Sequence, residues 1–377
     1  MVKRYLFYTA GDYDKTPETG GSKRFYELLK YLIEQGNEVF LIAPEDIKLP
    51  RWENLHLIPV KTYHSKIFPN GFLNLIFNWR TIRKASRIPV DKTVLFSVVY
   101  GIQGVLAGMP NIVLLLREDL IDYQLYRRVK NKYFFILKVF FYRLIEYITF
   151  RNIEKIIVQS HYDKAVLLKR HSVIHEKISD KTEVLINNVN ASWMLFSENL
   201  VRKIPVQPKG DYHFIFTGNF HSERKGASIV LAAVNSLLQD GFPICLFLLG
   251  GGKLRKTYEE EYKNRDRIIF LGYQTDPLKV ISRVDLLIVP SLADSCPNTV
   301  LEGLYLKIPV IGTNRGGIPE LLKEPELLFE PDVSSLKEKL KDIIENNKFE
   351  LLRQKCIKRS DELNFDWSSK LVQMIDA

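Results

Sequence analysis

Short apolar strands alternate with helical segments twice along this 377-residue chain, and this alternation restricts its fold more than any other feature. Strands are predicted in the first half at residues 5–9, 38–43, 55–60, 93–98, 112–116, 155–159 and 183–186. Strands are predicted in the second half at residues 213–217, 244–249, 268–271, 286–289 and 310–313. Such alternation is typical of parallel sheets covered by helices on both faces. The sequence therefore predicts an α/β protein with two doubly wound parallel sheets.

A stretch rich in proline and glycine separates the two series of strands. Residues 200–212 contain Pro205, Pro208 and Gly210 and show little apolar periodicity, which indicates a linker. The chain is also longer than one hydrophobic core usually serves. We predict a first domain at 1–204 and a second at 205–362. The tail from 334 to 375 is predicted to be helical throughout, with one break near residues 364–366.

Charge is distributed unevenly along the chain. The net charge is +10, and residues 1–200 hold 29 Lys and Arg against 20 Asp and Glu, which is +9. An excess of this kind indicates an anionic partner for the first half rather than a property of the fold. The contents of hydrophobic and charged residues, 46% and 26%, are ordinary for a folded soluble protein.

Cysteine and histidine spacing favours neither a metal site nor a redox site. The three cysteines are scattered, as suits a reducing cytosol, and the seven histidines show no metal-binding spacing. The N-terminal residues run directly into a predicted strand without a small-residue cleavage site, so we expect no signal peptide. The expected location is the cytoplasm.

The segment 290–320, PSLADSCPNTVLEGLYLKIPVIGTNRGGIPE, is the strongest chemical signal. Asp294 and Glu302 are separated by seven residues and follow a buried strand, and a helix begins near Thr299. A strand, loop and helix in this order place helix N–H groups at the edge where α/β proteins hold phosphorylated ligands. Alternatively, Thr299 and Glu302 form a capping box that only stabilises the helix start. On spacing alone, the two interpretations are about equally good.

The whole segment resembles the donor-site signature of the retaining family 4 glycosyltransferases, P-S-x-x-E-x7-E followed by an apolar strand and G-G-x-x-E. Glu320 completes the pattern, and Asp294 replaces its first glutamate. The resemblance implies the GT-B fold, in which two Rossmann-like domains face a cleft. It implies an acceptor in the first domain, a nucleotide-sugar donor in the second, and a last helix at 363–377 that crosses back to the first domain.

Weaker elements appear in the order of that family. Gly20-Gly21 before the first helix resembles its first-domain loop, although two glycines there more often form only a tight turn. Lys225-Gly226 resembles its diphosphate-binding element, although a single lysine is by default a surface cation. Asn219 stands where the family usually has arginine, so either Arg224 supplies that charge or the site uses one cation. Further glycine loops resemble those beside the donor and the nucleobase, at Gly250 and at Gly272-Tyr273.

The resemblance assigns a role to each site residue. Asp294 would contact the donor sugar, and Glu302 would bind the ribose hydroxyls. Lys225 and the N–H groups of Asn298 and Thr299 would neutralise the diphosphate of a UDP or GDP sugar without a metal. Pro297 shapes the loop before the helix. Arg117 stands where many relatives have histidine, and either contacts the donor sugar or acceptor or forms a structural pair with Glu118.

Two segments of the first half combine cations with aromatic residues. Residues 123–155 contain eight Lys and Arg and two Glu among many aromatic side chains, and residues 66–87 repeat the pattern. Amphipathic helices of this composition bind anionic membrane surfaces, although the aromatic residues could instead fill the core. Membrane docking is the slightly better interpretation. Nucleic acid is not expected, because no binding motif accompanies the charge.

These features together predict a retaining glycosyltransferase of the hexosyltransferase type. It would move a sugar from a nucleotide diphosphate to a glycan or lipid-linked acceptor in surface polysaccharide or glycolipid synthesis, peripherally on the inner face of the membrane. The alternatives are a catalytically weak scaffold that binds sugar nucleotides, and an epimerase or hydrolase on the same fold.

Overall fold

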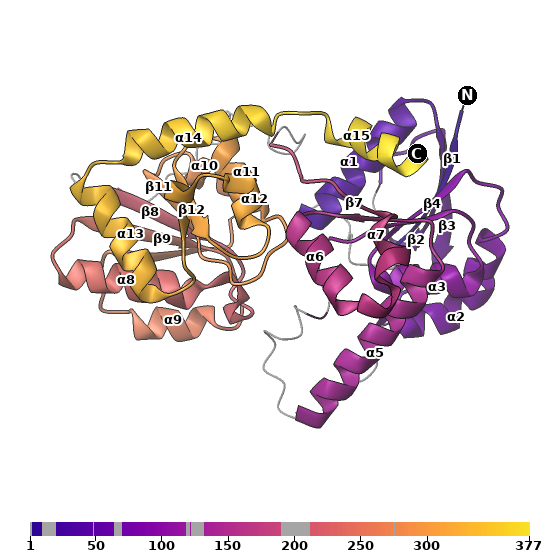
Figure 1. Ribbon diagram of the computed structural model, residues 1–377, viewed down its shortest axis with the longest axis horizontal. Helices are drawn as coiled ribbons and strands as arrows, with labels where there is room; N and C mark the ends of the chain where they lie inside the picture. The colour runs from indigo at the N-terminus through magenta and orange to yellow at the C-terminus, as the bar shows by residue number, and fades with distance from the viewer. Residues whose placement is uncertain are drawn as a thin grey trace. The chain divides into compact units, whose positions relative to one another are not determined.

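The computed structural model describes residues 2–9, 20–47, 49–63, 70–117, 121, 132–189, 212–274 and 276–377. These residues form two compact units (Figure 1). The first contains the described residues up to 185 together with 366–377, and the second contains those from 186 to 365. The predicted boundary at residues 204 and 205 lies outside the described residues, as does most of the predicted linker.

The first unit is built on a parallel sheet of seven strands within the described residues. The strands are β1 (Arg4–Tyr8), β2 (Glu38–Pro44), β3 (Leu55–Val60), β4 (Lys92–Phe96), β5 (Ile112–Leu115), β6 (Lys155–Val158) and β7 (Thr182–Val184). Their order is β3-β2-β1-β4-β5-β6-β7, so the chain winds outward from β1 in both directions. Strands β4, β5 and β6 consist mostly of apolar residues and are almost wholly buried, because helices cover both faces of the sheet.

Helices α2 and α5 lie on either side of α3 in the first unit. The helices of this unit are α1 (Gly20–Glu34), α2 (Asn70–Ala85), α3 (Val98–Ala107), α5 (Lys132–Arg151), α6 (His161–Arg170), α7 (His175–Ser179) and α15 (Trp367–Asp376). The last helix, α15, packs against α1 and β4. The carboxylate of Asp376 fixes its end, since it accepts a hydrogen bond from the Tyr5 hydroxyl at 3.0 Å and pairs with Lys3 at 2.8 Å.

The second unit repeats this winding on a parallel sheet of six strands within the described residues. The strands are β8 (Tyr212–Thr217), β9 (Ile244–Leu249), β10 (Ile268–Gly272), β11 (Leu286–Val289), β12 (Val310–Thr313) and β13 (Leu328–Phe329), in the order β10-β9-β8-β11-β12-β13. The helices are α8 (Ala227–Gln239), α9 (Arg255–Glu261), α10 (Pro277–Ile281), α11 (Asn298–Tyr305), α12 (Ile318–Leu322), α13 (Val333–Glu345) and α14 (Phe349–Glu362). The predicted fold class, two doubly wound parallel sheets, is confirmed.

Two local predictions need correction. The tail is not helical throughout, because α13 and α14 are separated at residues 346–348, where Asn347 adopts a left-handed backbone conformation with φ 47°. Asparagine tolerates this region better than most residues, and it ends α13 there. The two-residue edge strand β13 was not predicted, since two residues are too few to show a periodicity.

Candidate functional site

The candidate site of the second unit lies at the carboxyl edge of its sheet. β8 and β11 are neighbours at the point where the winding reverses, and loops after both strands meet there. In doubly wound sheets this reversal point is where ligands bind. The loop after β8 carries Asn219, Arg224 and Lys225, and the loop after β11 carries Asp294.

An ion pair joins the two loops. The Lys225 ammonium donates a hydrogen bond to the Asp294 carboxylate, and both side chains are largely buried. Lys225 ends a short 3-10 turn, η3 (Glu223–Lys225), and Gly226 follows with φ 70°. A Cβ on Gly226 would collide with the carbonyl oxygen of Pro290, so only glycine allows the two loops to approach this closely. The structure thus brings together two predicted site residues that stand 69 positions apart.

The side chain of Arg224 binds the backbone of the neighbouring loop. Its Nη1 donates to the carbonyl oxygen of Ala293 at 3.1 Å, and its own carbonyl oxygen accepts from the Leu292 amide at 2.8 Å. In this position Arg224 holds the loop that carries Asp294. Asn219, the residue that replaces the family's arginine, is exposed just after β8.

A carboxylate that the sequence analysis did not single out holds the other side of η3. Glu223 accepts a hydrogen bond from the Tyr258 hydroxyl at 2.6 Å and another from the Ser228 hydroxyl at 2.8 Å. Burial, followed by the bond to Glu223, raises the pKa of the Tyr258 hydroxyl well above its usual range, so it remains a donor. The only signal in the sequence is the position of Glu223 two residues before Lys225, and its partners are set by the tertiary fold.

Helix α11 begins four residues after Asp294, at the place where the sequence predicts a helix start. Its first residue is Asn298 and its N-cap is Pro297, which makes no side-chain cap bond. Thr299 therefore lies inside the helix, and the alternative of a Thr299–Glu302 capping box, which needs Thr299 as the N-cap, is wrong. Glu302 lies one turn further along α11 and is partly exposed. Cys296, just before the helix, is buried.

The glycine pair after β12 fixes the backbone of Asp294. Gly316 has φ 60°, and a Cβ there would collide with the Asp294 carbonyl oxygen. That same oxygen accepts a hydrogen bond from the Gly317 amide at 2.9 Å. The predicted glycine pair is therefore needed for a close approach between two backbone segments.

The weaker glycine loops also meet at this edge. Gly250 follows β9 with φ 130°, and a Cβ there would collide with the Gly218 carbonyl oxygen. The Gly250 amide donates to the Gly272 carbonyl oxygen at 2.9 Å, which joins the ends of β9 and β10. Tyr273, the next residue, leaves 65% of its surface exposed. An exposed aromatic ring at this edge is suited to stacking on a nucleobase.

In the first unit, Gly20 and Gly21 are the first two residues of α1 rather than part of a loop before it. Arg117 follows β5 at the carboxyl edge of the sheet. Glu118, the partner in the alternative role for Arg117, lies outside the described residues.

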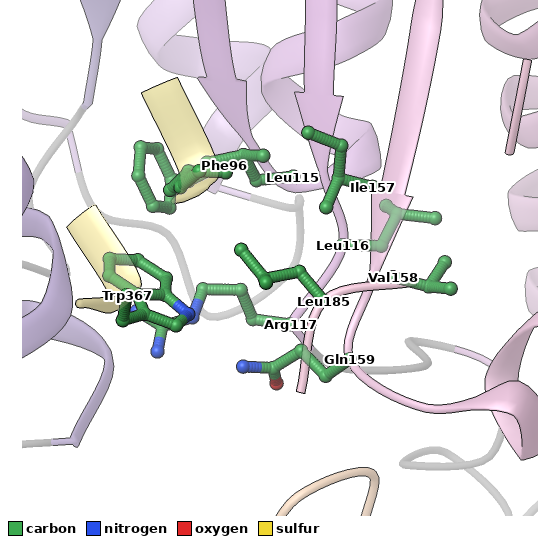
Figure 2. A pocket seen from close by; sticks show the side chains of 10 residues that line it. Phe96, Leu115, Leu116, Arg117, Ile157, Val158, Gln159, Leu185 and Trp367 are labelled. Carbon is green, nitrogen blue, oxygen red and sulfur yellow. The ribbon is translucent and has the colours of Figure 1, made fainter. Parts of the chain in front are cut away.

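Arg117 lines a small cavity of about 20 Å³, the space of one water molecule, which Figure 2 shows from close by. The walls are otherwise apolar except for Gln159 and Trp367, and come from the ends of β4, β5 and β6 and from α15. Trp367 is 5% exposed, and the guanidinium of the fully buried Arg24 lies 4.9 Å from its ring centroid. In Figure 2 the Arg117 side chain extends to the same indole. The sequence analysis did not find Arg24 or Trp367, which stand 343 positions apart.

Among the described residues, no group of three or more His, Cys, Asp and Glu side chains could hold a metal ion. Within the same part of the chain, no helix is both long and apolar enough to cross a bilayer.

Solved structures with the same architecture define the fold class. Over 99% of this chain and 97% of the other, it matches sucrose-phosphate synthase of Thermosynechococcus elongatus with a TM-score of 0.74 and 17% identity. WaaG, a glycosyltransferase involved in lipopolysaccharide biosynthesis, matches with a TM-score of 0.70 and 17% identity over 99% and 98% of the two chains. Anabaena HepE in complex with UDP-glucose matches with a TM-score of 0.69 and 16% identity over the same shares. The protein therefore has the GT-B fold.

Sequence comparison identifies the second unit more closely. Residues 211–346 match the family described as glycosyl transferases group 1. Two uncharacterised glycosyltransferases of Methanocaldococcus jannaschii are 26% and 28% identical to 46% and 58% of this chain. An Escherichia coli UDP-Gal:α-D-GlcNAc-diphosphoundecaprenol α-1,3-galactosyltransferase is 23% identical over 48% of each chain. The matches cover about half the length of these curated relatives, 42% and 54% for the first two.

Proposed function

We propose that the protein is a glycosyltransferase that moves a sugar from a nucleotide diphosphate, of the UDP or GDP type, to an acceptor hydroxyl. The observation that carries the proposal is the Lys225–Asp294 pair, whose aspartate lies four residues before the start of α11. It places a cation and a carboxylate together at the edge of a doubly wound sheet, in a loop that leads into a helix. The match of residues 211–346 to glycosyl transferases group 1 supports this proposal.

Different residues act on the leaving group and on the sugar. As the bond to the diphosphate breaks, negative charge develops on the leaving phosphate and positive charge on the sugar ring. Lys225 and the N–H groups at the start of α11 stabilise the phosphate. Asp294, which Lys225 binds in this structure, is released when the diphosphate takes its place on the lysine, and then faces the sugar. Glu302 accepts hydrogen bonds from the ribose hydroxyls, and the loops at Gly250 and Gly272, with Tyr273, frame the base.

Charge neutralisation by Lys225 and helix N–H groups removes the need for a metal ion at the diphosphate. In this scheme Arg224 acts on the loop rather than on the phosphate, because its guanidinium binds the Ala293 carbonyl. The site then works with one side-chain cation. Retention of the sugar's configuration is part of the proposal, supported by the resemblance of residues 290–320 to retaining enzymes.

A lipid-linked or membrane-proximal glycan is the proposed acceptor, held by the first unit near Gly20, Gly21 and Arg117. The excess of +9 in residues 1–200 favours an anionic acceptor or surface. The Escherichia coli relative is named for a diphosphoundecaprenol acceptor, which supports the same class. The proposed location is the inner face of the cell membrane.

The test is product analysis by mass spectrometry with a panel of UDP and GDP sugars, in the presence and absence of a membrane lipid extract. If the protein transfers the sugar, a product is expected only when both a sugar nucleotide and the extract are present. NMR of the anomeric signal of that product shows whether the sugar keeps its configuration. Donor turnover at the same rate with and without the extract would instead identify an epimerase or hydrolase. Donor binding without any turnover would identify a scaffold protein.

A further inference from the structure

One face of α5 exposes a continuous row of large apolar side chains. Their exposed fractions are Tyr133 83%, Ile136 53%, Leu137 65%, Phe140 64%, Phe141 38% and Leu144 45%. The spacing of three and four residues places all six on one side of the helix, over a length of about 17 Å. Single exposed apolar residues are ordinary, but a contiguous row on one element marks an interaction surface. We call these six residues the α5 row.

The second half of α5 anchors the helix in the first unit. Ile145 and Phe150 are buried. The buried carboxylate of Glu146 accepts hydrogen bonds from Arg170 at 3.2 Å and pairs with His171 Nε2 at 2.8 Å. The first half of the helix extends away from the sheet (Figure 1). The α5 row is therefore held at a fixed place on the outside of the first unit.

Positive charges dominate the layer of helices that contains the α5 row. Helices α2, α3 and α5 together contain seven Lys and Arg and a single carboxylate, the buried Glu146. α2 adds exposed apolar side chains of its own, Ile76, Phe77 and Trp79. Since α3 packs between α2 and α5, the two helices belong to one layer on the same face of the sheet.

We propose that the α5 row lies in the headgroup region of an anionic lipid bilayer and holds the first unit at the membrane surface. Aromatic and aliphatic side chains on one helix face, flanked by Lys and Arg, suit this position in the plane of the membrane. A second copy of the chain fits less well, because it would bring two cationic layers together. The inference rests on the proposed function in one respect, since it names the surface that would bring the enzyme to a lipid-linked acceptor.

Vesicle co-sedimentation tests the proposal with the full chain. Vesicles of mixed phosphatidylglycerol and phosphatidylcholine are compared with vesicles of phosphatidylcholine alone. The double variant Leu137→Ser/Phe140→Ser is expected to bind the anionic vesicles about tenfold more weakly than the wild type. Leu351→Ser, which alters a leucine on α14 in the second unit that is 50% exposed, is the control and is expected to bind as the wild type does. High salt is expected to weaken binding because it screens the cations.

A tryptophan in the α5 row reports insertion directly. Phe140→Trp is expected to show a blue-shifted emission with anionic vesicles and quenching by spin-labelled lipid. Equal binding by the double variant and the wild type would overturn the proposal, and so would equal binding to neutral and anionic vesicles. A concentration-dependent dimer that the double variant abolishes, with no vesicle binding, would assign the row to a second copy.

An assay of donor turnover distinguishes a failure of the membrane proposal from a failure of the proposed function. The double variant is expected to hydrolyse or transfer from a soluble sugar nucleotide at the wild-type rate. Vesicle binding by a wild-type protein that turns over no sugar nucleotide would refute transfer and leave the membrane surface standing.

Discussion

The carboxyl edges of the two sheets carry different kinds of side chain. In the second unit, loops after β8 and β11 bring a lysine and a carboxylate into contact, and glycines let the backbones approach. In the first unit, the edge at β4, β5 and β6 is an apolar cavity with Arg117 and Gln159 in its wall, closed by Trp367 from α15. The first arrangement suits a charged diphosphate, whereas the second is a largely apolar cavity with the space of about one water molecule. Two sheets with the same doubly wound order therefore present different chemistry at corresponding edges.

The largest effect is expected when the donor site loses its charged groups. Lys225→Ala and Glu302→Ala are each expected to lower the transfer rate by about a thousandfold, because removal of one strong electrostatic contact costs about 3–4 kcal/mol in the transition state. Transfer is measured with a radiolabelled sugar nucleotide, and circular dichroism checks the fold. Lys341→Ala, which alters an exposed lysine of α13, is the control and is expected to keep full activity. Wild-type rates in both site variants would remove the basis of the proposed function.

The contact between the two donor-site loops is expected to show in stability. Gly226→Ala should lower the free energy of unfolding of the second unit by about 3 kcal/mol or more, since the new Cβ collides with the Pro290 carbonyl. Gly241→Ala is the matched control, because its φ is similarly positive but its Cβ would meet no atom within 4 Å. It should cost about 1 kcal/mol from backbone strain alone. Urea titration measures both, and equal losses would mean that the close approach is unimportant.

In the first unit, Arg117→Ala is expected to lower kcat/KM for the acceptor about tenfold and to leave the affinity for the donor nucleotide unchanged. The reason is that Arg117 lies at the edge of the first sheet, and the donor residues lie in the second unit. Titration calorimetry with UDP or GDP measures donor affinity. Arg151→Ala, at the end of α5, is the control. A loss of nucleotide affinity in Arg117→Ala would assign this arginine to the donor instead.

Tyr258→Phe is expected to have a smaller effect on the donor side. It removes a hydrogen bond to Glu223 and loosens the turn that carries Lys225. A bond to a charged group contributes about 1.5–3 kcal/mol, and only part of that loss should reach Lys225. We expect KM for the donor to rise about threefold to tenfold while the pH profile of kcat stays unchanged. Tyr262→Phe, at the end of the same helix, serves as the control and should leave KM unaltered.

The smallest effect concerns Cys356. Burial raises the pKa of its thiol to about 11, so the native protein keeps it protonated at pH 8. Iodoacetamide at this pH should leave Cys356 unlabelled and the activity intact, with mass spectrometry as the readout. The unfolded thiol ionises at lower pH than the folded one, so its contribution to stability is lost as the pH rises from about 9 to about 11. Rapid labelling of the native protein at pH 8 would contradict the buried position.

Much of the fold follows from local sequence. The predicted bounds of β3, β9, β11 and β12 equal the observed ones. In β9 and β11 the reason is a continuous apolar run, which marks a buried parallel strand. The loops that carry the candidate site residues were also singled out from the sequence, since their residues are close together within each loop. The cavity in the first unit was not, because Phe96, Arg117, Gln159 and Trp367 belong to four separate segments.

The prediction that residues 123–155 dock on a membrane was made from composition. The structure separates the exposed residues of this segment from the buried ones. Residues 123–131 and Phe68 lie outside the described residues. Within α5 the row from Tyr133 to Leu144 is exposed, whereas Ile145 and Phe150 fill the core. Composition could not separate the two halves, because both contain aromatic residues and cations.

The sequence by itself determined the two series of strands, the doubly wound order that such series adopt, and the glycines and charges of the donor loops. Only the tertiary structure decided which of these side chains meet. It paired Lys225 with Asp294, turned Arg224 onto a backbone carbonyl, placed Glu223 between two hydroxyls, and left one half of α5 exposed. The physical reason is range: backbone preferences and apolar periodicity act between near neighbours in the chain, whereas ion pairs and burial depend on neighbours in space.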